Sequence, residues 1–166
     1  MNRTIITAIG TDRPGLVDKI SSIIHQNNGN IENSKMIKIN DQFAMIIDFS
    51  YLENIEVIKN DFNEIKELDI TYKTIQNSDT SNKQNKKYLI NGADNQGIVN
   101  RISNFFSNNN INIIEVNTFL ESAPITGTPL FNMEIMINYN NSNNISEINS
   151  KLNNLCEDLN LDIKIL

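Results

Sequence analysis

The 166-residue sequence contains one cysteine, one histidine and no tryptophan. A single cysteine, Cys156, excludes an internal disulfide framework, and His25 with Cys156 supplies too few ligands for a zinc site of ordinary spacing. The same scarcity leaves little from which to build Cys–His or Ser–His catalysis. We therefore expect no metal, no cofactor and no enzyme activity.

Long apolar runs are also missing, and no stretch is long enough to span a bilayer. The sequence opens directly on a strand-like run, without the apolar region of a signal peptide. We therefore expect a soluble, cytoplasmic protein with no membrane partner.

Basic residues are few. The 14 lysines and arginines are outnumbered by 20 acidic residues, which gives a net charge of −6, and the three arginines do not cluster. Because nucleic-acid phosphates are usually gripped by a basic patch, we expect no direct contact with nucleic acid. The length allows one ordinary domain or two small ones.

The sequence does contain an internal repeat. At an offset of 82 residues, the segment 12–17 (DRPGLV) falls on 94–99 (DNQGIV), and 30–31 (NI) falls on 112–113 (NI). Farther along the offset is 90, which places an alternating apolar run from Phe43 on one from Met133. The eight extra residues fit a single loop insertion at 122–129, which holds two of the three prolines.

Each copy has the same predicted order of elements. A short apolar strand (Thr4–Ile9 or Tyr88–Ala93) precedes an amphipathic helix, two strands, a second helix and a closing strand (Asp69–Ile75 or Leu161–Leu166). This order is the ferredoxin-like βαββαβ unit. The sequence therefore predicts an α+β fold of two tandem ferredoxin-like units with antiparallel sheets, at 1–77 and 87–166. A polar linker at 78–86 is expected to join them.

The strongest local feature is the strand-to-helix turn from Gly10 to Gly15. Pro14 suits a first helical turn, Asp12 or a neighbour can cap the free amides, and Gly15 permits a close approach of backbone or ligand. Such a helix N-terminus is a favourable binding site for a carboxylate. The alternative is that Asp12 is only a cap and Gly15 only a packing glycine.

A turn of the form D-R-P-G-[LI]-V after a strand, within a βαββαβ unit of this length, resembles the ACT-domain family. The segments 7–17, 29–34, 123–131 and 155–160 are also similar to the subfamily of glycine cleavage system transcriptional repressors. ACT domains are regulatory modules that commonly bind amino acids between paired copies. The resemblance implies a site formed by the first strand-helix turn of one copy and the second strand of a neighbour.

Carried onto this chain, the resemblance implies two sets of ligand-binding residues, one from each copy. They are Asp12, Arg13, Pro14, Gly15, Leu16, Val17, Asn30 and Ile31, and in the second copy Asp94, Asn95, Gln96, Gly97, Ile98, Val99, Asn112 and Ile113. The second turn departs from the family pattern, because Asn95 and Gln96 stand where the first copy has Arg13 and Pro14. The second copy either completes the site of the first, which we favour slightly, or binds with a different selectivity.

The function implied by the resemblance is that of an amino-acid-sensing repressor of glycine cleavage genes. Glycine or a similar small amino acid would be the effector, and a DNA-binding transcription factor would be the protein partner. A homodimer is also expected. The alternative is an ACT-type regulatory subunit that binds an amino acid and controls a metabolic enzyme.

Three further features carry weaker expectations. The 122–129 insertion is either a lid or partner-docking loop, which we favour modestly because long loops in tight repeats are often functional, or a plain hairpin connection. His25 is expected to be a solvated residue at a helix end. Cys156 is expected to be a small core residue.

Overall fold

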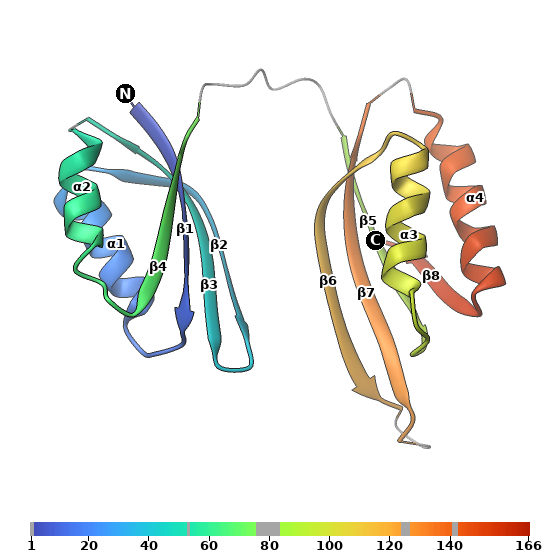
Figure 1. Ribbon diagram of the computed structural model, residues 1–166. Helices are drawn as coiled ribbons and strands as arrows, with labels where there is room; N and C mark the ends of the chain where they lie inside the picture. Colours follow the sequence, from blue (N-terminus) through green and yellow to red (C-terminus); the bar gives the residue numbers. More distant parts are fainter. Residues whose placement is uncertain (1, 53, 76–83, 124–126, 141–142) are drawn as a thin grey trace. The chain divides into compact units, whose positions relative to one another are not determined.

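The structure, a computed structural model, describes residues 2–52, 54–75, 84–123, 127–140 and 143–166. The chain divides into two compact units, Met1–Asp79 and Thr80–Leu166, here called unit 1 and unit 2 (Figure 1). None of the helices in these ranges is long and apolar enough to cross a membrane.

The two units have the same order of elements. Unit 1 consists of β1 (Asn2–Thr11), α1 (Leu16–Gln26), β2 (Asn30–Ile39), β3 (Gln42–Tyr51), α2 (Ile55–Phe62) and β4 (Leu68–Thr74). Unit 2 consists of β5 (Gln84–Ala93), α3 (Ile98–Asn108), β6 (Asn112–Ser122), β7 (Pro129–Tyr139), α4 (Ile145–Asp158) and β8 (Leu161–Ile165). The duplicated βαββαβ fold predicted from the sequence is confirmed.

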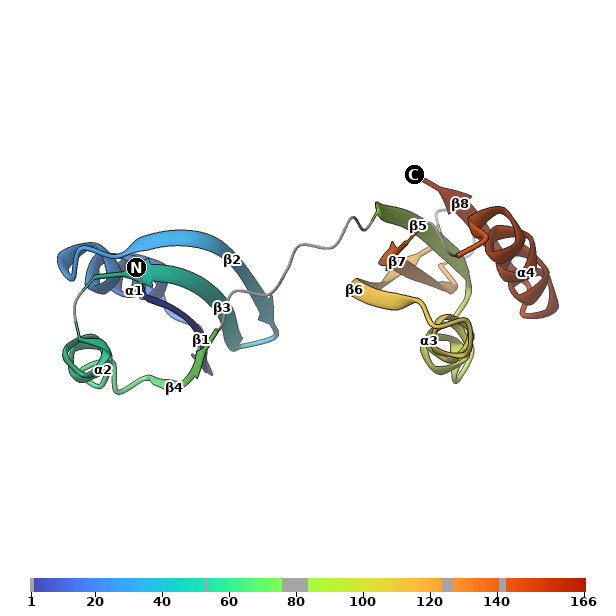
Figure 2. The same ribbon diagram turned by 90° about the horizontal axis from the view of Figure 1, so that it is seen from above.

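Each unit is a two-layer structure. The strands form antiparallel sheets in the orders β2-β3-β1-β4 and β6-β7-β5-β8, and both helices of a unit cover the same face of its sheet (Figures 1 and 2). The other face of each sheet carries none of the described helices of its own unit. The edge strands β2 and β6 each pair on one side only.

The core of each unit lies between its helices and its sheet. In unit 1, Leu16, Ile20 and Ile24 of α1 are buried against alternate residues of β3, among them Phe43 and Phe49. Unit 2 repeats this arrangement with a helix face of Ile98, Ile102 and Phe106. Full burial of one such side chain contributes about 1.5–3 kcal/mol, so this spacing of apolar residues suffices to fix both helices on their sheets.

The register of the strands corrects the predicted alignment of the two copies. Gly10 pairs with Phe43 and the equivalent Gly92 pairs with Phe131, so the third strands match at an offset of 88 rather than 90. The helix caps Asn54 and Asn144 do match at 90. Compared with unit 1, unit 2 therefore has six extra residues in its β6–β7 hairpin and two more between β7 and α4. Sequence periodicity did not separate the two offsets, because a shift of two keeps every strand residue on its face.

Two boundaries also differ from the sequence prediction. Residues 84–86, assigned to the linker, belong to β5, because their backbone pairs with β7 from Gln84 opposite Tyr139 onward. Ser122 and Pro129, assigned to the inserted loop, end β6 and begin β7. The amide of Ala123 donates to the carbonyl of Thr128 at 2.9 Å, which closes a hairpin connection. The rest of the predicted linker, 78–83, and loop residues 124–126 lie outside the described residues.

Candidate ligand-binding site

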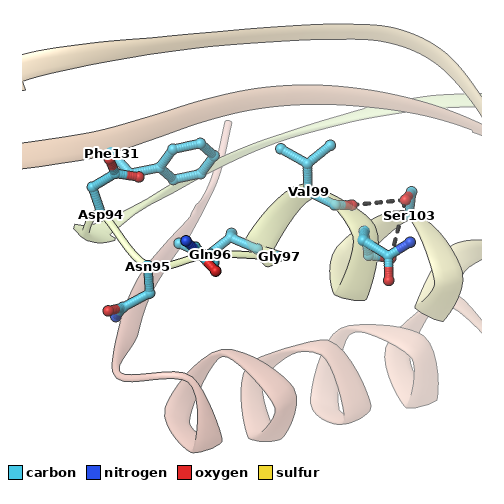
Figure 3. A pocket seen from close by; sticks show the side chains of 9 residues that line it. Asp94, Asn95, Gln96, Gly97, Val99, Ser103 and Phe131 are labelled. Carbon is cyan, nitrogen blue, oxygen red and sulfur yellow. Dashed lines mark hydrogen bonds between the residues drawn. The ribbon is translucent and has the colours of Figure 1, made fainter.

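The turn between β5 and α3 lines an open hollow on unit 2 (Figure 3). Its lining consists of Asp94, Asn95, Gln96, Gly97, Ile98, Val99, Asn100, Ser103 and Phe131. All six turn residues that the resemblance implied for the second copy are therefore brought together. Figure 3 shows Phe131 of β7 beside Asp94 at one end of the turn and Ser103 of α3 toward the other.

A glycine in the left-handed region shapes the turn in each unit. Gly15 and Gly97 precede the first residues of α1 and α3 with φ angles of 90° and 86°. A Cβ added at either position would meet no atom of the described residues within 4 Å. These glycines are therefore needed for their backbone conformation, and no close approach of the chain's own backbone requires them. The close approaches occur instead at Gly10, where a Cβ would clash with the Glu67 carbonyl oxygen, and at Gly92, where it would lie 3.0 Å from that of Asn160.

The first turns of α1 and α3 have no side-chain cap. The expectation that Asp12 or a neighbour caps α1 is wrong, because Gly15, which has no side chain, occupies the cap position and Asp12 lies three residues before it. In unit 2, the Ser103 hydroxyl donates to the carbonyls of Val99, at 2.7 Å, and Asn100, at 3.1 Å. Ile98 is buried and Val99 is half exposed, so this helix start is anchored in the core while one apolar side chain faces the hollow.

The two aspartates at the start of the turns have different surroundings. Asp12 Oδ2 lies 2.6 Å from Lys38 Nζ, and the Asp12 amide donates to the Asp41 carbonyl at 2.7 Å, which ties the first turn to the β2–β3 hairpin. Asp94 is exposed and makes no ion pair or hydrogen bond with any other described residue. At the position of Lys38, unit 2 has Leu120, since both residues face the equivalent phenylalanines Phe43 and Phe131.

Lys38 is a residue that sequence reasoning missed. It lies 26 positions from Asp12, outside any local motif, and its proximity follows from the hairpin register of β2 and β3. Lys38 pairs with the core residue Phe43 and therefore lies on the helix side of the sheet. Strand alternation predicts that side, but it does not identify Asp12 as the partner of Lys38.

The second-strand residues lie away from the turn of their own unit. Asn30 and Ile31 begin β2 after α1, whose 11 residues correspond to a length of about 16 Å. They line a separate hollow with Ser21, Ser22, Ile24, His25 and Gly29. Asn112 and Ile113 begin β6 in the same way after α3. Within one unit, the turn and the second strand therefore do not form one site. A site shared by the turn of one copy and the second strand of a neighbouring copy stays a prediction.

The weaker sequence candidates can also be placed. His25 is an exposed residue in the last turn of α1, as expected. Cys156 is fully buried in the core of unit 2, as expected, and burial raises the pKa of its thiol to about 11. Among the described residues, no group of three histidine, cysteine or acidic side chains could hold a metal ion.

A polar cluster on unit 1 was not anticipated. The Arg3 guanidinium donates to both carboxylate oxygens of Asp48, and the Ser50 hydroxyl donates to Glu32 Oε1 at 2.6 Å. The hydrogen bonds from Ser50 and Asn30 hold the pKa of Glu32 below its usual value. Glu32 lies at a bulge between Ile31 and Asn33, which explains why sequence alternation did not group it with Ser50.

Known proteins resemble this chain in sequence. The model of the ACT-domain family matches residues 2–72. A UPF0237 protein of Methanococcus maripaludis is 34% identical over 65 residues, which cover 39% of this chain and 68% of that protein. The chain belongs to the ACT-domain family. A UPF0237 protein of Methanopyrus kandleri is 45% identical over 47 residues, and the chain spans about half (52%) of its length.

Solved structures match both units of the chain together. A protein of unknown function from Galdieria sulphuraria has a TM-score of 0.87 at 22% identity, with 99% of this chain and 96% of that chain covered. A candidate glycine cleavage system transcriptional repressor has a TM-score of 0.72 at 19% identity with the same coverage. At these identities the likeness establishes the fold of two consecutive βαββαβ units.

Proposed function

We propose that this chain is an amino-acid-sensing regulatory protein whose ligand binds at the strand-helix turn of unit 2. Membership of the ACT-domain family supports a regulatory role. The observation that carries the choice of unit is the open hollow beside Asp94, which pairs with no other described residue, in contrast with the ion-paired Asp12 of unit 1. This choice departs from the interpretation favoured on sequence grounds, in which the second copy only completes the site of the first.

The chemistry of the hollow fits a free amino acid. The Asp94 carboxylate complements an α-ammonium group, and the uncapped start of α3 offers backbone N–H groups and the positive end of the helix dipole to an α-carboxylate. Asn95 and Gln96 add amide donors and acceptors. Both charged ends of one small molecule are thereby matched within a single turn.

The effector that we propose is glycine or a similar small amino acid, and the output is repression of glycine cleavage genes. The fold match to a candidate repressor of that system supports this choice. With a net charge of −6, the chain would act on transcription through a DNA-binding protein partner in the cytoplasm. A homodimer whose arrangement changes on ligand binding would transmit the signal, because a ligand favours the arrangement that it binds more tightly.

Calorimetric titration of the full chain with glycine, followed by alanine, serine and the other amino acids, tests this proposal. We expect saturable binding of a small amino acid that falls by tenfold or more in Asp94→Asn. Asp12→Asn is the matched control, because it makes the same change at the equivalent turn of unit 1, and it should bind as the parent does. Equal loss in both variants, or in neither, would contradict the assignment to unit 2.

The partner requires its own experiment. Affinity purification with and without glycine should recover a DNA-binding protein whose association depends on the amino acid. Recovery of a metabolic enzyme in its place would favour the alternative of a regulatory subunit.

A further inference from the structure

The hollow at the turn of unit 2 has more room than glycine alone would fill. Its volume is about 630 Å³, within the range of about 300–1,000 Å³ found for small-molecule sites. Glycine has no side chain, and the Asp94 carboxylate and the start of α3 match only the two charged ends of an amino acid. Part of the hollow is therefore left for a side chain of the ligand, and the neighbouring residues decide which kind it accepts.

Apolar side chains line the side of the hollow that faces β6 and β7. Phe131 of β7 and Val99 of α3 both belong to the lining, and Val99 is 42% exposed. In Figure 3 these two side chains lie toward the strands, whereas that of Asn95 points away from them. A hydrocarbon group of a ligand that contacts Val99 and Phe131 is removed from water, which favours its binding.

Leu120 adds a third apolar side chain from the edge strand β6. It pairs with Phe131, so it lies on the helix side of the sheet, and it is 59% exposed. Its place near the turn follows from unit 1, where Lys38 pairs with the equivalent Phe43 and its ammonium reaches the Asp12 carboxylate. A leucine at this position is shorter than a lysine and carries no charge. Unit 2 therefore offers an open apolar surface where unit 1 has an ion pair.

The polar side chains of the hollow give a hydroxyl-bearing ligand little in return for the water that it would lose. The Ser103 hydroxyl already donates to the carbonyls of Val99 and Asn100. The Asn95 amide points away from the apolar side of the hollow (Figure 3). A polar group placed against an apolar surface without a hydrogen-bond partner weakens binding, so the hollow favours a hydrocarbon side chain.

We propose that the effector bound by unit 2 carries a small aliphatic side chain and that Leu120, together with Val99 and Phe131, selects it. This inference rests on the proposed function, in which an amino acid binds at this turn, and it narrows the effector to one such as alanine or valine. Each methylene group buried on binding raises affinity about fourfold. Valine therefore gains severalfold over glycine even when half of its side chain stays exposed.

Calorimetric titration of the full chain with glycine, alanine, valine and threonine tests this selectivity. We expect the affinity to rise from glycine through alanine to valine, at least fivefold overall. Threonine, which has the shape of valine with a hydroxyl in place of one methyl group, should bind at least threefold more weakly than valine. Glycine or threonine bound as tightly as valine overturns the inference, and the proposed function stands if that binding depends on Asp94. A chain that binds no amino acid overturns both.

Leu120→Ser tests the residue that makes the selection. It should weaken valine binding at least threefold and change glycine binding less than twofold, because glycine has no side chain to contact Leu120. Ile165→Ser is the matched control, since Ile165 is 45% exposed but lies on β8 at the opposite edge of the same sheet, and both affinities should stay at the parent values. Circular dichroism checks that each variant is folded. A valine-to-glycine ratio that is the same in Leu120→Ser and in the parent overturns the proposal.

Leu120→Lys tests the position of Leu120 beside the charged end of the site. The new ammonium should reach Asp94 as Lys38 reaches Asp12 in unit 1, and it should weaken the binding of glycine and valine alike by at least tenfold. Leu120→Met is the matched control, because methionine has a similar length without the charge, and it should keep the preference for valine. Equal affinities in the lysine and methionine variants would show that residue 120 lies too far from Asp94, which overturns the proposal.

Discussion

The ammonium of Lys38 lies 2.6 Å from the carboxylate of Asp12 and joins the first turn of unit 1 to the end of strand β2. No described residue of unit 2 makes the equivalent contact with Asp94, because Leu120 occupies the position of Lys38. Two copies of one fold thus present the same turn in two electrostatic states, and this difference leads to the first prediction.

Lys38→Leu, which gives unit 1 the residue found in unit 2, should release the Asp12 carboxylate. We expect the number of amino acids bound per chain, measured by calorimetric titration, to rise from one toward two. Stability should change by less than about 1 kcal/mol, since both partners of the pair are partly exposed. Lys73→Leu is the control, because Lys73 lies on β4 outside the turn. An unchanged number of bound amino acids would show that Arg13 and Pro14, rather than Lys38, prevent binding at the turn of unit 1.

The glycines of unit 1 should differ in the cost of an added methyl group. Gly15→Ala should lower the free energy of unfolding by about 1–2 kcal/mol, because an L-residue pays that much for the left-handed conformation. Gly10→Ala should cost more, because its Cβ would meet the Glu67 carbonyl oxygen. Urea unfolding midpoints provide the measurement, and Gly97→Ala should reproduce the Gly15 value. The reverse order would mean that the turn relaxes away from its positive φ.

Alkaline pH should destabilise unit 2 through two buried groups. Burial raises the pKa of Cys156 to about 11 and that of Tyr88 to about 12, from ordinary values of about 9 and 10. The unfolded chain therefore releases these protons first, and the free energy of unfolding falls as the pH rises from about 9 to about 12. Urea midpoints against pH should show this fall, and Cys156→Ala should flatten its part between pH 9 and 11. An unchanged slope in that variant would exclude the thiol as the cause.

Cys156 should also be protected from thiol reagents. Because its side chain is fully buried and stays protonated near neutral pH, we expect Ellman's reagent to react at pH 8 only as fast as the chain unfolds. Addition of guanidinium chloride should make one thiol per chain react rapidly. A fast reaction in the native protein would show that α4 opens locally.

Each unit should fold without the other. The two hydrophobic cores share no residue, and all the described strand pairings lie within one unit. A fragment of residues 1–79 should show cooperative thermal unfolding by circular dichroism, with a stability of about 4–12 kcal/mol. The fragment of residues 80–166 is the paired experiment. A fragment that lacks a cooperative transition would show that this unit depends on the other for its stability.

Local patterns in the sequence predicted most of the fold. The helical spacing of Leu16, Ile20 and Ile24 and the alternation from Phe43 onward each describe one buried face, and burial of those faces is what forms the two layers. The turn 94–97 was found by comparison of the two copies. The pairing of Lys38 with Asp12 was not predicted, since it depends on the register of a hairpin and on the path of the chain after β1.

The sequence by itself determined the duplication, the βαββαβ order and the positions of both glycine turns, because these depend on periodicity and on backbone conformations within a few residues. Tertiary structure alone decided that the extra residues divide into six and two, and that Asp12 is ion-paired while Asp94 pairs with no other described residue. Each of these depends on which strands lie side by side and in what register. Strand register is fixed by contacts between residues far apart in the chain, and local pattern does not specify them.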